Sequence, residues 1–242
     1  MCGTCGCASE IEHGHGHGRT VPLEVDVLAK NDGLAAANRA EFARRGIVVL
    51  NLMSSPASGK TTLLERTVRS LGAELPVGVL EGDQETVLDA DRIGAAGARV
   101  VQINTGAGCH LDAGMVARAL PSLAPAAGSV VFVENVGNLV CPALFDLGEH
   151  ARVVIMSVTE GADKPLKYPH MFRTADLVLL NKIDLLPYVD FDVAAWVAAA
   201  RRARPGVAVL EVSATRGDGL DAWYAWVRAA RREIPTSVAP RS

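Results

Sequence analysis

The chain has 242 residues, of which 49% are hydrophobic and 21% are charged, and its formal net charge at pH 7 is −3. This length and apolar content are enough to bury a sizeable core and are typical of a soluble α/β protein. The near-neutral charge argues against nucleic acid or a membrane surface as a partner. No apolar run approaches the roughly 20 residues that cross a bilayer. The first residues are rich in Cys and His rather than having the basic and apolar regions of a signal peptide, so we expect a cytoplasmic protein.

Residues 1–20 differ from the rest of the chain in composition. Cys2, Cys5 and Cys7 are followed by histidines that alternate with glycine across residues 13–17. Such a segment buries too little apolar surface to fold alone, so we expect it to be flexible unless metal orders it. Three closely spaced thiolates can bind one soft or borderline cation such as Ni²⁺ or Zn²⁺. Incidental or redox-active thiols are the alternative, and a tag or a passive metal-scavenging tract explains the histidines equally well.

Residues 21–46 read as a connector and a helix that packs on the main domain. Asn31 or Asp32 is the expected N-cap, because both side chains can accept a hydrogen bond from the first helical turn. Gly46 follows the last helical residue, where glycine is favoured.

From residue 47 onward, apolar strand patterns alternate with helical ones. Strands are expected at 47–53, 77–83, 99–104, 129–134, 152–158, 177–180 and 207–212, helices at roughly 60–71, 89–93, 111–123, 190–204 and 218–231, and loops at 135–150 and 159–174. Continuous Val/Ile/Leu strands separated by helices predict a mostly parallel sheet covered on both faces. Residues 47–234 are therefore expected to form one three-layer α/β domain, followed by a short tail at 235–242. Ligands of such sheets gather at the carboxyl ends of the strands.

A Gly-Lys-Thr sequence follows the first of these strands and begins a helix. This is the context of a phosphate-binding loop, in which backbone N–H groups and the helix N-terminus bind phosphate, Lys60 reaches the β- and γ-phosphates and the Thr61 hydroxyl binds Mg²⁺. The fold is then that of P-loop NTPases. Ser54 replaces the glycine that begins the strict pattern, so an ordinary strand-to-helix turn is the alternative. The expected phosphate contacts are Ser55, Pro56, Ala57, Ser58, Gly59, Lys60, Thr61 and Thr62.

A second polar motif, at residues 181–184, follows a later strand and predicts which base is bound. The Asp184 carboxylate can accept two N–H donors from guanine, and Asn181 can donate to a base acceptor. Adenine lacks that donor pair and leaves the carboxylate unpaired. Lys182 completes the motif, and Ser213 and Ala214, after the next strand, are expected to contact the same base.

Two acidic residues end strands near the phosphate loop. Mg²⁺ is usually bound through one or two carboxylates and several waters, which makes Asp83 and Glu134 its expected ligands beside Thr61. For Asp83 the alternative is a helix N-cap. Gly137, three residues after Glu134, is expected to sense the γ-phosphate through its amide.

Two further thiols fall in loops at the same edge of the predicted sheet. Cys109 and His110 follow one strand, and Cys141 follows another. A buried cysteine often acts as a small hydrophobe. Because these three residues lie in polar, glycine-containing loops, a Ni²⁺ or Zn²⁺ site is the preferred interpretation.

These motifs together resemble the hydrogenase nickel-incorporation GTPases of the HypB family. The resemblance covers nearly the whole chain and rests on Cys2-x-x-Cys5-x-Cys7, residues 54–62, Glu81-Gly82-Asp83, residues 105–110, residues 134–142 and residues 181–184. In this family, serine is the expected residue at position 54. The resemblance implies a homodimer of the dimerising class of P-loop GTPases, in which GTP hydrolysis to GDP is coupled to nickel delivery. It also implies two partners, a [NiFe]-hydrogenase large-subunit precursor and a nickel metallochaperone.

The resemblance further implies a nickel site at Cys2, Cys5 and Cys7, and a nickel or zinc site at Cys109, His110 and Cys141 near the dimer interface. The candidate catalytic residues are Lys60, Thr61, Asp83, Glu134 and Lys164.

Catalysis and two rival functions remain open at the level of sequence. No glutamine is placed to orient water, so intrinsic turnover is expected to be slow. Lys164 is the candidate for additional positive charge, and it could reach a nucleotide across a dimer. One rival is a urease-maturation GTPase, which the N-terminal cysteines disfavour. The other is a nickel-storage protein with a regulatory nucleotide site, which the histidine tract favours and the intact nucleotide motifs disfavour.

Overall fold

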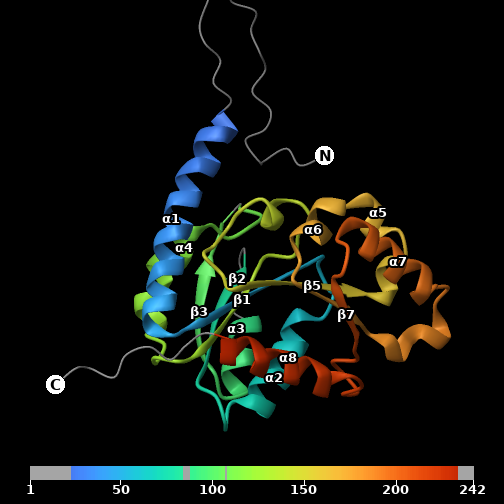
Figure 1. Ribbon diagram of the computed structural model, residues 1–242. Helices are drawn as coiled ribbons and strands as arrows, with labels where there is room; N and C mark the ends of the chain where they lie inside the picture. Colours follow the sequence, from blue (N-terminus) through green and yellow to red (C-terminus); the bar gives the residue numbers. More distant parts are fainter. Residues whose placement is uncertain (1–22, 84–87, 107, 234–242) are drawn as a thin grey trace, which may run out of the picture.

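The computed structural model of the protein describes residues 23–83, 88–106 and 108–233 (Figure 1). The expectations for Cys2, Cys5 and Cys7, for the histidine tract and for the C-terminal tail lie outside the described residues. Of the helices described, none combines the length and apolar character needed to span a bilayer.

A seven-stranded sheet forms the centre of the molecule, and all its paired strands are parallel, as the sequence predicts. The strand order is β3-β2-β4-β1-β5-β6-β7. The strands are β1 (Val48–Ser54), β2 (Val77–Asp83), β3 (Arg99–Asn104), β4 (Val130–Glu134), β5 (Ala151–Ser157), β6 (Leu177–Asn181) and β7 (Ala208–Glu211). β1 lies between β4 and β5, so the phosphate loop follows an interior strand of the sheet.

Helices cover both faces of the sheet. They are α1 (Leu23–Arg45), α2 (Lys60–Leu71), α3 (Leu88–Ala95), α4 (Ala113–Leu123), α5 (Lys164–Lys167), α6 (Pro169–Thr174), α7 (Val193–Ala203) and α8 (Leu220–Glu233). In β1, Leu50 and Leu52 pack into the core that α2, α3 and α8 cover. Val49 and Met53 point to the opposite face, which is covered by α1 and α4 at one end and by α5–α7 at the other. This alternation is the period of two that buries both faces of a strand.

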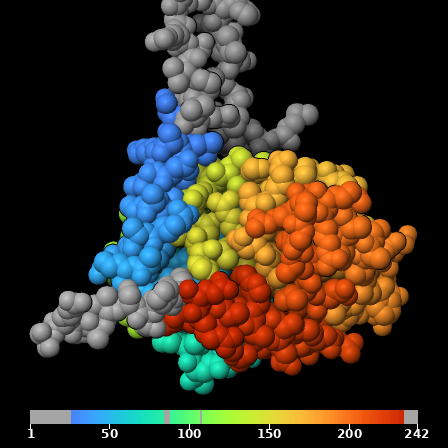
Figure 2. Space-filling model, viewed as in Figure 1, coloured from blue at the N-terminus to red at the C-terminus, as the bar shows by residue number. Residues whose placement is uncertain are grey.

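The start of α1 differs from the sequence prediction. The helix begins at Leu23, so neither Asn31 nor Asp32 caps it. Asn31 is instead a buried mid-helix residue: its Nδ2 donates to Asp146 O at 2.8 Å, and its Oδ1 accepts from Ala113 N at 2.9 Å. A short polar side chain suits either a cap or a tertiary contact, and here the tertiary contact prevails. Figure 2 shows α1 (blue) lying along the yellow-green segment that contains Asp146.

The two segments expected to be loops contain short helices. A 3₁₀ helix, η1 (Cys141–Ala143), lies within residues 135–150, and the 3₁₀ helix η2 (Val158–Glu160) with α5 and α6 occupies most of residues 159–174. η1, α5 and α6 each have a proline at the first or second helical position, where a missing N–H costs no helical hydrogen bond. Asp112 and Asp192 cap α4 and α7, which therefore begin two or three residues later than predicted. A further 3₁₀ helix, η3 (Ile183–Tyr188), precedes α7.

One buried hydrogen bond joins α8 to α2 and leads to a prediction about stability. Trp223 Nε1 donates to Thr67 Oγ1 at 2.8 Å, and both residues are fully buried. The nearly isosteric change Thr67→Val leaves the indole N–H without an acceptor, which should lower the free energy of unfolding by about 1–3 kcal/mol. Urea unfolding measures this loss. Thr215→Val, at an exposed position, is the control and should change stability by less than about 0.5 kcal/mol. Equal effects of the two changes would contradict the assignment.

Candidate functional site

The predicted motifs gather at one edge of the sheet, at the carboxyl ends of the strands. The phosphate loop follows β1, Asp83 ends β2, residues 105–110 follow β3, and residues 135–141 follow β4. The base motif follows β6 in the same way. Parallel strands place all these ends together, as expected for a doubly wound sheet.

The phosphate loop has the backbone shape that phosphate binding requires. Ala57 and Gly59 have positive φ angles of 59° and 99°. A Cβ atom added at Gly59 would lie 2.5 Å from Asn181 Nδ2, so only glycine fits there. Lys60 Nζ donates to Ser54 Oγ at 2.7 Å, and burial lowers the pKa of Lys60.

Two clefts flank Lys60. The first, of about 330 Å³, is lined by residues 57–62, Asp89, Arg92, Glu134 and Lys182. The second, of about 290 Å³, is lined by Pro56, Ala57, Lys60, residues 81–83, Asp89 and residues 134–137. Since Lys60 lines both clefts, together they form one groove across the loop.

Two buried carboxylates lie beside the phosphate loop. Glu81 and Glu134 occupy paired positions of β2 and β4, and each is almost completely buried. Burial raises the pKa of Glu81 to about 8, with the Glu134 charge adding to the shift, and burial raises the pKa of Glu134 to about 7. Thr61 Oγ1 donates to Glu134 Oε1 at 2.8 Å.

The chemistry of this carboxylate pair fits a divalent cation. Glu81 Oε2 and Glu134 Oε2 are buried and have no hydrogen-bond partner among the described residues. Buried carboxylate oxygens of this kind need a proton or a cation, and carboxylate and hydroxyl oxygens suit Mg²⁺. Asp83, at the end of β2, lines the same groove. Glu81 was not among the predicted ligands; the alternation of side chains in β2 could have indicated that it shares a face with Asp83.

The base motif lies against the phosphate loop. Asn181 Nδ2 donates to Ser58 O at 2.8 Å, and Asn181 Oδ1 accepts from Ala214 N at 3.0 Å. Lys182 Nζ donates to Ala57 O at 2.8 Å. Asn181 therefore joins the predicted phosphate loop to the loop that follows β7.

The Asp184 carboxylate, which the sequence predicts to select the base, is oriented by a neighbouring hydroxyl. Ser213 Oγ donates to Asp184 Oδ1 at 2.6 Å, and Ser213 Oγ accepts from Arg216 N at 3.0 Å. The hydrogen bond occupies Asp184 Oδ1 and restrains the orientation of the carboxylate, which favours recognition of a base edge.

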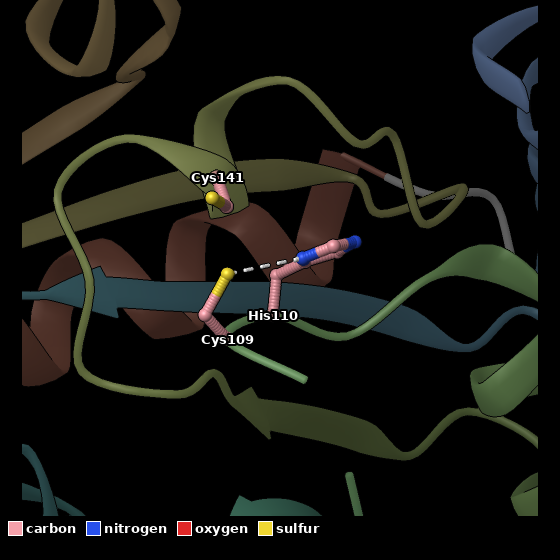
Figure 3. Close-up of side chains that lie close together, drawn as sticks. All are labelled: Cys109, His110 and Cys141. Atoms are coloured by element: carbon pink, nitrogen blue, oxygen red, sulfur yellow. Dashed lines mark hydrogen bonds between the residues drawn. The ribbon is translucent and has the colours of Figure 1, made fainter. Parts of the chain in front are cut away.

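Cys109, His110 and Cys141 come together at the same edge, as the sequence predicts. One potential ligand atom from each residue lies within 4.8 Å of the others, and Cys109 Sγ is 3.7 Å from His110 Nδ1. Figure 3 shows the two thiols and the imidazole near one another, with Cys141 contributed by η1. Burial lowers the pKa of His110, which keeps the imidazole neutral and able to bind metal. The His110 ring stacks on Phe145 with 3.9 Å between centroids.

The profile of the CobW/HypB/UreG nucleotide-binding domain matches residues 48–211. The chain belongs to this family. The hydrogenase maturation factor HypB of Rhizobium leguminosarum bv. viciae is 57% identical over 223 residues, which cover 91% of this chain and 75% of the relative. The HypB of Escherichia coli strain K12 is 53% identical over 232 residues, covering 92% of this chain and 80% of the relative. The crystal structure of Helicobacter pylori HypB in complex with nickel is 36% identical, with a TM-score of 0.79 over 88% of this chain and all of that one.

These likenesses confirm the resemblance to HypB and the P-loop NTPase fold. More than half of the aligned residues are identical over about nine-tenths of the chain, so this protein belongs to the HypB branch of the family.

Lys164 occupies a different position in this HypB-family chain from the other candidate catalytic residues. It begins α5, and its Nζ lies 5.5 Å from the centre of the Tyr168 ring. It is not among the described residues that line the two clefts. Within one chain, therefore, Lys164 lies outside the groove.

Sequence reasoning missed Glu160. Its Oε2 accepts a hydrogen bond from Ser55 Oγ, and its Oε1 accepts from Ser157 N at 3.1 Å. The Ser-x-x-Glu spacing of a capping box at Ser157 and Glu160 was a signal for the second bond. No sequence signal could report the bond to Ser55, which spans the fold and fixes the first half of the phosphate loop.

Nucleotide selectivity provides a test of the base motif. Asp184→Asn replaces the acceptor of two guanine N–H groups by an amide, which should weaken GTP binding at least about tenfold and improve binding of xanthosine triphosphate. Titration with both nucleotides by calorimetry measures the change. Asp190→Asn, on the same segment but exposed, is the control. Unchanged GTP affinity in Asp184→Asn would refute the assignment.

The raised pKa of Glu81 predicts a pH-dependent stability. Its pKa of about 8 lies above the ordinary 4.5, so the folded protein binds more protons than the unfolded chain between these values. The contribution of Glu81 to the free energy of unfolding is full below pH 4.5 and falls as pH rises toward 8. Wild type should therefore lose stability relative to Glu81→Gln across this range, in urea unfolding with EDTA and without nucleotide. A constant difference between the two proteins would contradict the burial of an ionisable Glu81.

Proposed function

We propose that this chain is a nickel-binding metallochaperone GTPase that hydrolyses GTP to drive or gate nickel insertion during [NiFe]-hydrogenase maturation. The observation that carries the proposal is that a single residue, Asn135, connects the predicted phosphate site to the thiol–imidazole set, which is formed by Cys109, His110 and Cys141. Asn135 Oδ1 accepts from Leu111 N, next to His110, and from Val136 N, next to Gly137. The family relationship and the nickel-bound HypB of H. pylori agree with this function.

The phosphate loop and the carboxylates supply the hydrolytic site. Lys60 neutralises charge on the β- and γ-phosphates, while Thr61, Asp83 and Glu134 hold Mg²⁺, which supplies further positive charge at the phosphates. Gly137 lies against Pro56, since a Cβ atom added to Gly137 would be 2.9 Å from both N and Cα of Pro56. Gly137 also lines the cleft of Lys60 and Asp83, and its amide binds the γ-phosphate there. Lys164 acts from a second copy of the chain, consistent with its position outside the groove of its own chain, and turnover in a single chain is slow.

Nickel is the cargo, and the chain offers two places for it. Cys109, His110 and Cys141 bind Ni²⁺ or Zn²⁺ beside the nucleotide, and Cys2, Cys5 and Cys7 form a separate nickel site. The active form is a cytoplasmic homodimer, and nickel passes to the precursor of a hydrogenase large subunit with the help of another nickel metallochaperone. The relatives named hydrogenase maturation factors support this assignment.

Reciprocal binding of nickel and nucleotide tests the coupling. If the loop after β4 joins the two sites, nickel must change the affinity for a non-hydrolysable GTP analogue, and the analogue must change nickel affinity by the same factor. His110→Ala should abolish both changes, because it removes one ligand. His170→Ala, at an exposed position, should preserve both. Analogue affinity that ignores nickel in the wild-type protein would refute the coupling.

Hydrogenase maturation in cells tests the function itself. A strain lacking this protein should produce a [NiFe]-hydrogenase large subunit with little nickel, and the wild-type chain should restore the nickel content. Lys60→Ala should not restore it, because the lysine that contacts the phosphates is gone. Arg44→Ala, an exposed change on α1, is the control. Normal nickel content in the deleted strain would disprove the proposed function.

A further inference from the structure

The short helix α3 carries an arginine to the phosphate groove that the motifs do not include. Arg92 lines the cleft of about 330 Å³ together with residues 57–62 of the phosphate loop and the start of α2. Its side chain is 47% exposed. The guanidinium is thus accessible to a molecule in that cleft.

Three contacts fix the direction of the guanidinium. Arg92 Nε contacts Glu65 Oε1 at 2.8 Å, and Nη1 contacts Asp89 Oδ1 at 3.1 Å. Nη2 reaches Thr62 Oγ1 at 3.4 Å, on the first turn of the helix that begins with Lys60. Nη2 of the guanidinium is therefore directed toward the first turn of α2, beside the helix N-terminus at which phosphate binds in a P-loop protein. An arginine held in this way loses little further side-chain entropy when it binds an oxyanion.

The charged residues that line the cleft also favour a role for Arg92 in binding an anion. Asp89 and Glu134 line it and disfavour an anionic ligand, while Lys60 and Lys182 favour one. Lys182 Nζ is bonded to a carbonyl of the phosphate loop. Arg92 neutralises Asp89 and adds a guanidinium that can donate two charge-assisted hydrogen bonds to phosphate oxygens.

The position of Arg92 along the groove indicates which phosphates it meets. It lines the cleft that contains Lys182, beside the base motif, and is not among the described residues that line the cleft of Asp83 and Gly137. We propose that Arg92 binds the phosphates that GDP and GTP share and does not sense the γ-phosphate. This inference rests on the proposed nucleotide function and adds one binding residue to it.

Affinities for a series of ligands test the assignment. Arg92→Ala should weaken binding of GDP and of a non-hydrolysable GTP analogue by the same factor, about tenfold to a hundredfold, and leave guanosine binding unchanged. Arg92→Lys should lose less nucleotide affinity, because lysine retains the positive charge but lacks the paired N–H donors of the guanidinium. Arg69→Ala is the matched control, since Arg69 pairs with the same Glu65 at 3.9 Å and is not among the described residues that line the cleft.

The same titrations separate the ways in which the proposal can fail. Guanosine binding reports that the base site of each variant is folded. If Arg92→Ala binds both nucleotides as the wild type does, the arginine makes only a structural ion pair and the inference is wrong. A loss confined to the GTP analogue would make it a γ-phosphate sensor and overturn the stated position. If the wild-type protein binds GTP no better than guanosine, the proposed nucleotide function fails as well.

Discussion

The parallel pairing of β4 with both β1 and β2 imposes the constraint on which the site depends. That register places Glu134 beside Leu52, two residues before the phosphate loop, and beside Glu81 on the other side. Two buried carboxylates in adjacent strands cannot both be ionised without nearby positive charge. Lys60 supplies part of that charge, and its own burial makes its charged form costly unless an anion or a carboxylate is close. A bound cation would therefore reduce the repulsion between the two carboxylates, and a bound phosphate would stabilise the charged form of Lys60. Both ligands can for this reason change the arrangement of the groove.

A single buried amide links this electrostatic centre to the thiols. Asn135 Nδ2 donates to Asn51 Oδ1 at 3.2 Å, and its Oδ1 accepts backbone N–H groups from the loops after β3 and β4. Those two loops carry Cys109 and Cys141, respectively. Since the distances among Cys109, His110 and Cys141 depend on how the two loops sit together, a shift of the loop after β4 would change the proposed metal site directly. The linkage needs no long path through the core, because the loops share one hydrogen-bonding residue.

The parts of this structure that the sequence predicts are those determined locally. Continuous apolar runs predict the strands, and motifs at strand ends predict the groove, because parallel strands necessarily bring their carboxyl ends together. Contacts between distant segments escaped prediction. Asn31 bonds to residues 82 and 115 positions away rather than capping a helix, and Ser55 bonds to Glu160, 105 positions away. Arg92 escaped for the same reason, because the packing of α3 on α2 determines which side of the groove its side chain reaches.

Ser54 shows how backbone conformation and a local side-chain contact can explain a departure from a motif. Glycine is needed in a phosphate loop where the backbone has positive φ or approaches another group closely. Here Ser54 is the last residue of β1 and has an extended backbone, and the left-handed positions are Ala57 and Gly59. Serine therefore causes no backbone strain at this position. Its Oγ accepts a hydrogen bond from Lys60 Nζ at 2.7 Å. Lys60, the predicted phosphate ligand, is thus held at the loop by a neutral oxygen, and a phosphate oxygen could replace this interaction with a stronger one between opposite charges.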